Sequence, residues 1–241
     1  MNAHLFQAFF VVWRESVEAL LVVGILHGWL RTIPQSRFYY AFLWAGIAAG
    51  CALAGILAAA VYGADTLLFP AASEWLNLAM TAVAAVLIVR MVMWMHGKAP
   101  MLRQELERSL ARGVANRSGW AIASLAMIAV AREGSETVVF LFGIGSAAQG
   151  QDLYRFLLSA LLGAVAAGGT YVALLIAGRH ISQRLFFKTT EILLLLLGAS
   201  LALAAANGAA AIDLLPSPWL DVLFRPAWNI SAILADDALG G

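Results

Sequence analysis

Six long apolar runs constrain this chain more than any other feature of its sequence. A helix needs about 20 mostly apolar residues to span a bilayer. The runs that meet this length are Leu5–Leu30, Phe38–Tyr62, Trp75–His96, Gly119–Ile144, Tyr154–Ala177 and Ile192–Ala211. Of the 241 residues, 62% are hydrophobic and 12% are charged, which is about half the charged share of a soluble domain. We therefore predict an all-α, polytopic membrane protein with six transmembrane helices and the lipid bilayer as its solvent.

Other features exclude several classes of protein. The net charge of +1 gives no indication of a nucleic-acid partner. A single cysteine, Cys51, rules out a disulfide framework or a cysteine-based zinc site within one chain. The first apolar run has no basic stretch before it and contains Arg14, Glu15 and Glu18, which a cleavable signal peptide does not. We expect this run to remain in the mature protein and no permanent cofactor to be bound.

The distribution of basic residues predicts the orientation. Ten of them lie in the loops after the first, third and fifth runs, and two lie in the remaining loops and the tail. Loops rich in Lys and Arg face the cytoplasm, so residues 97–118 form a cytoplasmic loop and the N-terminus lies outside. Residues 212–241 contain three prolines and are predicted to be an extracytoplasmic tail rather than a straight membrane helix.

An internal repeat divides this single membrane domain into two halves. The pattern Arg-Glu-x-x-Glu occupies Arg14–Glu18 and recurs 118 residues later at Arg132–Glu136. The same displacement places Ala164 and Gly168 opposite Gly46 and Gly50. We assign residues 5–96 to one three-helix repeat and residues 119–211 to the other. Three crossings per half make the repeats inverted, and transporters built in this way bind their substrate near the midplane between the halves.

The two motifs carry the chemistry. Each charged residue at a helix centre costs about 2.5–3.5 kcal/mol on insertion scales, so these side chains must face the protein interior or water. Glu15 and Glu18 share one helix face, and Arg14 lies four residues before Glu18. Arg132, Glu133 and Glu136 repeat this arrangement. If the motifs meet, four carboxylates and two guanidiniums surround one cavity with a net charge of −2.

A site of this kind suits a hard cation. Carboxylate oxygens favour such ions, and iron, especially Fe³⁺, fits, as Mn²⁺, Mg²⁺ or Ca²⁺ almost equally do. The competing interpretation is a pair of buried Arg–Glu bridges that only lock the helices together. Buried bridges are not reliably stabilising, and each motif has more carboxylates than arginines. We therefore favour an ion site.

At these residues the sequence resembles the oxidase-dependent iron permease family, which includes the fungal high-affinity iron permease and the membrane component of a bacterial three-part iron uptake system. The resemblance rests on both Arg-Glu-x-x-Glu motifs and extends to Trp94-Met95 and to the tail around Trp228–Asp236. It implies iron transport into the cytoplasm across a bacterial inner membrane, with extracytoplasmic iron-binding or iron-oxidising partners. It also implies a seventh membrane helix, expected to begin near Gly241. By the same resemblance the iron ligands are Glu15, Glu18, Glu133 and Glu136.

Secondary candidates lie outside the motifs. Glu74 and Glu191 occupy equivalent places in the two halves, displaced by 117 residues, and are either stations on the ion path or acids at helix starts beside the caps Ser73 and Thr190. Asp236 and Asp237 either capture iron outside or belong to a solvated tail. Arg90 is expected to snorkel to the cytoplasmic interface, and Met91 to pack in the core rather than to bind Cu⁺.

From the motifs and this resemblance we expect an iron permease in which Arg14 and Arg132 orient the ligating carboxylates. Transport of another hard cation such as Mn²⁺, proton coupling through the glutamates, and a non-transporting scaffold for a redox partner remain alternatives. An intramembrane enzyme is disfavoured, because no His-Glu-x-x-His, Ser/His or Cys/His arrangement lies at membrane depth.

Overall fold

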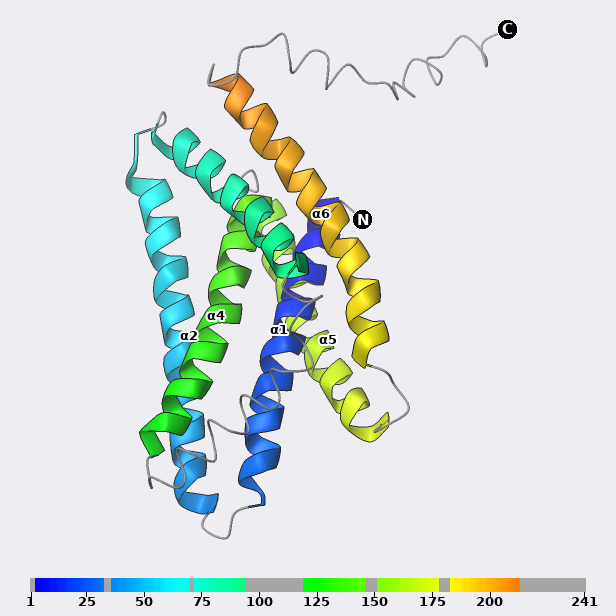
Figure 1. Cartoon of the computed structure of the whole chain (residues 1–241). Helices are drawn as coiled ribbons and strands as arrows, with labels where there is room; N and C mark the ends of the chain where they lie inside the picture. Colours follow the sequence, from blue (N-terminus) through cyan, green and yellow to red (C-terminus); the bar gives the residue numbers. More distant parts are fainter. Residues whose placement is uncertain are drawn as a thin grey trace, which may run out of the picture.

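The computed structural model describes residues 3–32, 36–69, 72–93, 119–145, 151–177 and 183–212, and each of these ranges contains one long helix. The helices are α1 (Ala3–Leu30), α2 (Ser36–Leu67), α4 (Gly119–Gly145), α5 (Gln151–Ala177) and α6 (Gln183–Ala211), together with a helix over Ala72–Met93 that we call the 72–93 helix (Figure 1). Each helix contains most of one predicted run. The all-α prediction is confirmed for the described residues. The loop 97–118 and the tail from residue 213 lie outside them.

The helices are those of an integral membrane protein. Four of them, α2, the 72–93 helix, α5 and α6, are long and apolar enough to cross a bilayer. The helices α1 and α4 have 28 and 27 residues and differ from the other four by the three charged residues that each motif contributes. Large apolar side chains such as Trp44, Ile56, Val86, Leu161 and Ile176 are exposed. The charged motif residues other than Arg132 are buried or partly buried, as expected when lipid is the solvent.

The two halves are intertwined. The helix α2 packs along α4, α1 packs along α5, and α1 also packs against α4, whereas α1 and α2 contact each other little. The first helix of each half therefore packs mainly against the second helix of the other half. The third helices also meet, because a side chain at Gly198 of α6 would lie 2.9 Å from Ile88 of the 72–93 helix. This exchange of partners is the pairing expected if the two predicted halves form an inverted repeat.

Glycines bring the paired helices close together. A Cβ atom added to Gly46 of α2 would overlap the carbonyl oxygen of Ala123 of α4, and one added to Gly50 would lie 2.9 Å from the carbonyl oxygen of Met127. In the other pair, a Cβ added to Gly163 of α5 would overlap the carbonyl oxygen of Phe9 of α1. Small residues at such positions let helix backbones approach closely in lipid. The motif-bearing helices are thus held by glycine faces from the opposite half.

Two apolar clusters bracket the centre of the α1–α4 contact. One contains Phe10 and Val11 of α1 with Phe140 and Ile144 of α4, and the other contains Leu26 and Leu30 with Ile122 and Ala126. The numbering runs in opposite directions, so α1 and α4 are antiparallel. The motifs lie between the two clusters, at the middle of both helices. The apolar packing therefore positions the charged residues opposite each other and away from either helix end.

Candidate metal centre

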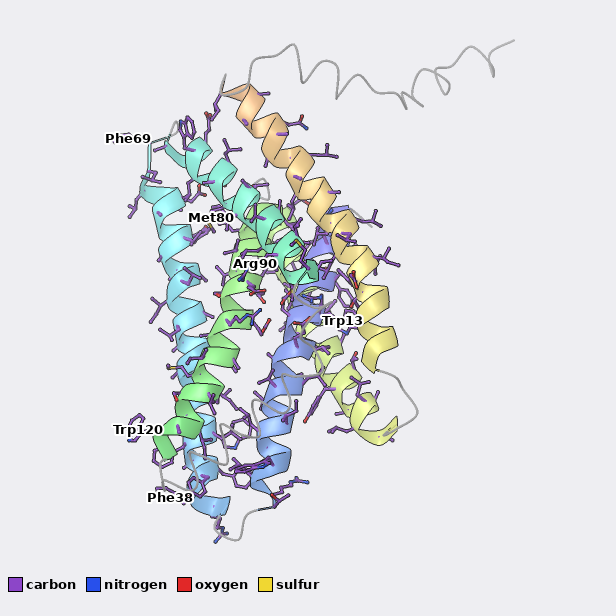
Figure 2. All side chains as sticks on the ribbon, viewed as in Figure 1. Trp13, Phe38, Phe69, Met80, Arg90 and Trp120 are labelled. Carbon is purple, nitrogen blue, oxygen red and sulfur yellow. The ribbon has the colours of Figure 1, made fainter. Side chains whose placement is uncertain are left out.

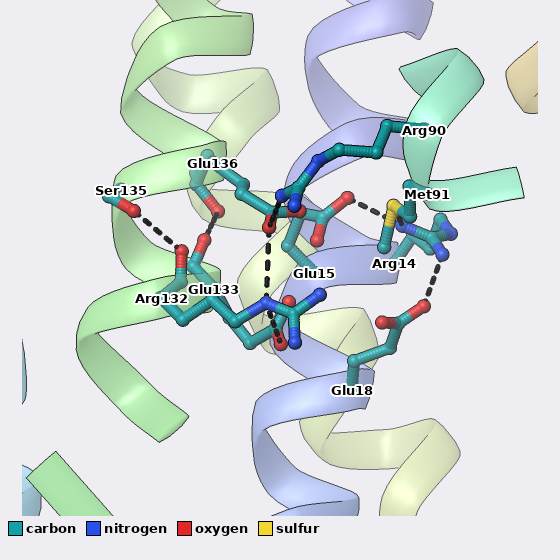
Figure 3. Close-up of polar contacts among 10 residues, drawn as sticks. Arg14, Glu15, Glu18, Arg90, Met91, Arg132, Glu133, Ser135 and Glu136 are labelled. Carbon is teal, nitrogen blue, oxygen red and sulfur yellow. Dashed lines mark hydrogen bonds and ion pairs between the residues drawn. The ribbon is translucent and has the colours of Figure 1, made fainter. Parts of the chain in front are cut away.

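Three glutamates from the two motifs converge where α1 faces α4 (Figure 3). Glu15, Glu133 and Glu136 each offer a carboxylate oxygen, and these three oxygens lie within 4.8 Å of one another. We call these three residues the carboxylate cluster. All three are buried, with residue exposures between 1% and 9%. The prediction that the motifs come together across the two halves agrees with this geometry.

The α1 copy of the motif is sealed. Arg14 is fully buried, and its Nη1 donates to Oε1 of Glu15 at 2.7 Å. Its Nη2 pairs with Oε1 of Glu18, and Nη1 also lies 2.8 Å from the sulfur of Met91 in the 72–93 helix. Glu18 is largely buried but is not one of the three converging carboxylates. Of the four predicted ligands, the structure therefore brings three together and places Glu18 at the edge, on Arg14.

The α4 copy is open. Arg132 Nε lies 3.2 Å from Oε1 of Glu136 and 3.9 Å from Oε1 of Glu133, and the Arg132 side chain is 41% exposed. A second guanidinium reaches the same oxygen, because Nη2 of Arg90 lies 3.8 Å from Oε1 of Glu136. A pocket of about 410 Å³ opens here. Its lining is formed by Leu87, Arg90, Arg132, Ser135, Glu136 and Val139.

The cluster leaves acceptors without donors. Among the described residues, Oε2 of Glu15, Glu133 and Glu136 has no hydrogen-bond partner, although each atom is buried. Burying an unpaired acceptor is costly, more so when it carries charge. A cation between these oxygens would remove that cost, and an all-oxygen carboxylate set suits a hard cation. The arrangement is therefore chemically able to bind a metal ion.

The structure corrects the expectation for Arg90. The sequence places it near the cytoplasmic end of the third run, but the 72–93 helix runs obliquely to α2 and α4 (Figure 1), and Arg90 Nη2 lies 3.8 Å from Oε1 of Glu136. Arg90 consequently lies at the carboxylate cluster instead of snorkelling to the interface. Its neighbour Met91 is buried, as predicted, but against Arg14. The sequence does contain a signal for this position, which is one more arginine within an apolar run. Whether that arginine reaches the carboxylate cluster depends on the tilt of the 72–93 helix, and packing against neighbouring helices sets that tilt.

The secondary candidates are not part of the cluster. Glu74 is exposed near the start of the 72–93 helix, and Glu191 is partly buried in α6. Because α6 begins at Gln183, Thr190 does not cap it, and the helix-start interpretation of Glu191 is wrong. Ser73 likewise lies inside its helix rather than before it. Asp236 and Asp237 lie outside the described residues.

Comparisons with protein families and with known proteins both match iron permeases. Residues 5–221 match the iron permease FTR1 family. The chain is 32% identical to the ferrous iron permease EfeU of Escherichia coli O6:K15:H31 (strain 536 / UPEC) and to that of Shigella sonnei (strain Ss046), over 98% of this chain and 83% of each relative. It is 31% identical to the ferrous iron permease EfeU of Yersinia pestis, over 83% of this chain and 71% of the relative. No solved structure matches the chain.

The family match covers both motifs and all six helices apart from the first two residues of α1, and the relatives are permeases rather than enzymes. They agree with the buried carboxylates that the two halves bring together. The protein is therefore an iron transport protein, and it belongs to the iron permease FTR1 family.

Proposed function

We propose that the protein carries ferrous iron into the cytoplasm through the carboxylate cluster. The observation that carries this proposal is the convergence of Glu15, Glu133 and Glu136 from opposite halves, with three carboxylate oxygens within 4.8 Å of one another. A site made by both halves can open to either side when the halves rearrange, which is the basis of alternating access in inverted repeats. Arg14 and Arg132 orient the carboxylates and offset part of their charge.

The charge of the surroundings favours a divalent ion. With all groups ionised, the two motifs carry −2, and Arg90 beside Glu136 reduces this to −1. A divalent ion balances the −2 of the two motifs, and a trivalent ion leaves +1. With Arg90 in place the totals become +1 and +2, so the divalent ion leaves the smaller positive charge in either case. The relatives are described as ferrous iron permeases. Mn²⁺ has the same charge and similar ligand preferences, so it is the competing substrate.

The proposed direction combines the orientation expected from the loop charges with the uptake that the family resemblance implies. The basic loops after the first, third and fifth helices face the cytoplasm by the positive-inside rule, which places the N-terminus outside an inner membrane. Iron then enters from the extracytoplasmic side. An iron-binding or iron-oxidising protein on that side would deliver it, as the family resemblance implies. Glu74 and Glu191 lie in the third helix of each half and would be stations on either side of the cluster.

Uptake into proteoliposomes tests the proposal. Purified protein is reconstituted, and radioactive iron is supplied with a reductant that keeps it ferrous. Glu15→Gln and Glu133→Gln each remove one ligand charge without changing the side-chain shape, so uptake should fall by at least about tenfold. The matched control is Asp152→Asn, since Asp152 is an exposed acid of α5 paired with Arg155. It should transport as the wild type does.

The same assay separates the alternatives. An excess of Mn²⁺ that abolishes iron uptake with equal potency would identify a general divalent cation transporter. No uptake by the wild-type protein across an imposed iron gradient would favour a non-transporting scaffold. Normal uptake by both glutamine variants would remove the carboxylate cluster from the mechanism.

A further inference from the structure

Arg90 is an unusual residue for its position. It lies about halfway between Phe69 at one end of the molecule and Phe38 and Trp120 at the other (Figure 2). Its side chain is 65% exposed. A guanidinium at this depth is strongly disfavoured in contact with hydrocarbon, and such residues face protein or a water-filled cavity instead. The pocket of about 410 Å³ that Arg90 lines beside Glu136 is therefore a hydrated approach to the carboxylate cluster.

Within that pocket, Arg90 is a second partner for Oε1 of Glu136, after Arg132. Oε1 of Glu136 accepts from Arg132 Nε at 3.2 Å, and Nη2 of Arg90 lies 3.8 Å from the same oxygen (Figure 3). Arg90 lines the pocket together with Glu136, so an ion that reaches Glu136 from this side passes the guanidinium. The longer contact and the greater exposure make Arg90 the partner that is more easily displaced.

The charges of the site make Arg90 and a divalent ion competitors. The motifs alone carry −2, which one divalent ion balances. With Arg90 still beside Glu136, binding of the same ion would leave the site at +1. We propose that Arg90 is a tethered counter-cation, which holds Glu136 while the cluster is empty, moves aside when the divalent ion binds, and returns when the ion leaves. This inference rests on the proposed transport function and names the group that regulates the same site.

The repeat supports a single counter-cation. The motif is duplicated, but Arg90 is not, because a displacement of 117 or 118 residues leads to Asn207 or Gly208 in α6. Neither residue carries a charge. Arg90 is therefore an addition to the repeated site, on the side where the α4 copy is open. The pocket lies between the 72–93 helix of the first half and α4 of the second half, and Arg90 has no charged counterpart at the equivalent position of α6.

Equilibrium binding of Fe²⁺ to the purified full chain in detergent, with a reductant present, tests the inference. If Arg90 competes with the ion, Arg90→Gln should tighten binding roughly threefold to fivefold, as loss of a partly exposed ion pair permits. Arg90→Lys keeps the charge and should bind within about twofold of the wild type. The matched control is Arg155→Gln, which removes an exposed arginine 3.7 Å from Asp152, away from the site. It should leave the dissociation constant unchanged.

The sign of the change separates this role from a structural one. If Arg90 merely supported Glu136, Arg90→Gln would weaken binding, and that result or an unchanged dissociation constant would overturn the inference. In transport assays, a displaced counter-cation predicts that Arg90→Gln lowers both KM and Vmax, because the ion binds more tightly and leaves more slowly. A structural role predicts a higher KM.

A second variant distinguishes failure of this inference from failure of the proposed function. Glu136→Gln should weaken Fe²⁺ binding, and adding Arg90→Gln to it should no longer tighten binding, because the shared carboxylate is gone. If Glu15→Gln and Glu136→Gln both bind iron as the wild type does, the proposed function itself fails. If both weaken binding but Arg90→Gln does not tighten it, the role of Arg90 alone is wrong.

Discussion

The two copies of the motif have the same sequence pattern and opposite surroundings. In the α1 copy, Arg14 is fully buried and bound by Glu15, Glu18 and Met91. In the α4 copy, Arg132 is 41% exposed and lies on a pocket. A duplicated motif therefore does not imply two equivalent half-sites. The α1 copy is enclosed by its neighbours, and the α4 copy borders a pocket.

The residues flanking the motifs explain the difference. On the α1 side, Trp13 Nε1 donates to Oγ1 of Thr170 in α5 at 2.9 Å. A displacement of 118 residues places Ala131 and Ala52 at the equivalent positions on the α4 side. Ala131 lines a second pocket, of about 460 Å³, between α2 and α4. The hydrogen-bonded pair of Trp13 and Thr170 fills the interface between α1 and α5, whereas the two alanines leave space between α2 and α4.

Replacing each motif arginine in turn should show this difference most strongly. Arg14→Gln leaves buried carboxylates without their main counter-charge, and losing one partner of a buried ion pair costs about 3–5 kcal/mol. Arg132→Gln should cost about 1 kcal/mol or less, because Arg132 is partly exposed and solvent screens its ion pairs. Thermal unfolding of the purified proteins in detergent measures both. Equal losses of stability would mean that the two copies are not differently sealed.

Much of this arrangement could be predicted from the sequence, for identifiable reasons. Run length and hydropathy predict the six helices. The free-energy cost of exposing charged side chains to lipid predicts that Arg14–Glu18 and Arg132–Glu136 face inward. The inverted repeat then predicted that they meet. The oblique 72–93 helix was not predictable, because tilt depends on packing against neighbours. For that reason the sequence alone predicts an interfacial position for Arg90. The unequal burial of Arg14 and Arg132 depends on contacts between helices distant in sequence, which a repeated motif does not encode.

Glycine substitutions should show that the helix packing, unlike the site, is symmetric. Gly46→Ala and Gly163→Ala each force a methyl group against a carbonyl oxygen of the opposing motif helix. Overpacking of this kind costs about 1–3 kcal/mol, and the two variants should lose similar amounts. The controls are Gly55→Ala and Gly169→Ala, where a Cβ meets nothing within 4 Å among the described residues. These should be neutral or gain up to about 1 kcal/mol from helix propensity. Thermal unfolding in detergent compares the four variants.

A large loss at one contact glycine and none at the other would contradict the two-fold pairing of α2 with α4 and of α1 with α5. Such a result would mean that the helix packing is as asymmetric as the site. Similar losses of stability would mean that the asymmetry is limited to the side chains around the motifs.

The smallest effect tests the proposed cause of the difference. Thr170→Val keeps the side-chain shape and removes the hydroxyl that accepts from Trp13 and donates to the carbonyl of Ala166. A hydrogen bond of this kind contributes about 0.5–1.5 kcal/mol, so the melting temperature should fall slightly. Iron affinity should stay the same, since Thr170 does not belong to the carboxylate cluster. The control is Thr66→Val, because the exposed Thr66 hydroxyl bonds within its own helix, to the carbonyl of Gly63. If Thr170→Val is no less stable than this control, the Trp13–Thr170 contact does not seal the α1 copy, and the alanines opposite it do not account for the open one.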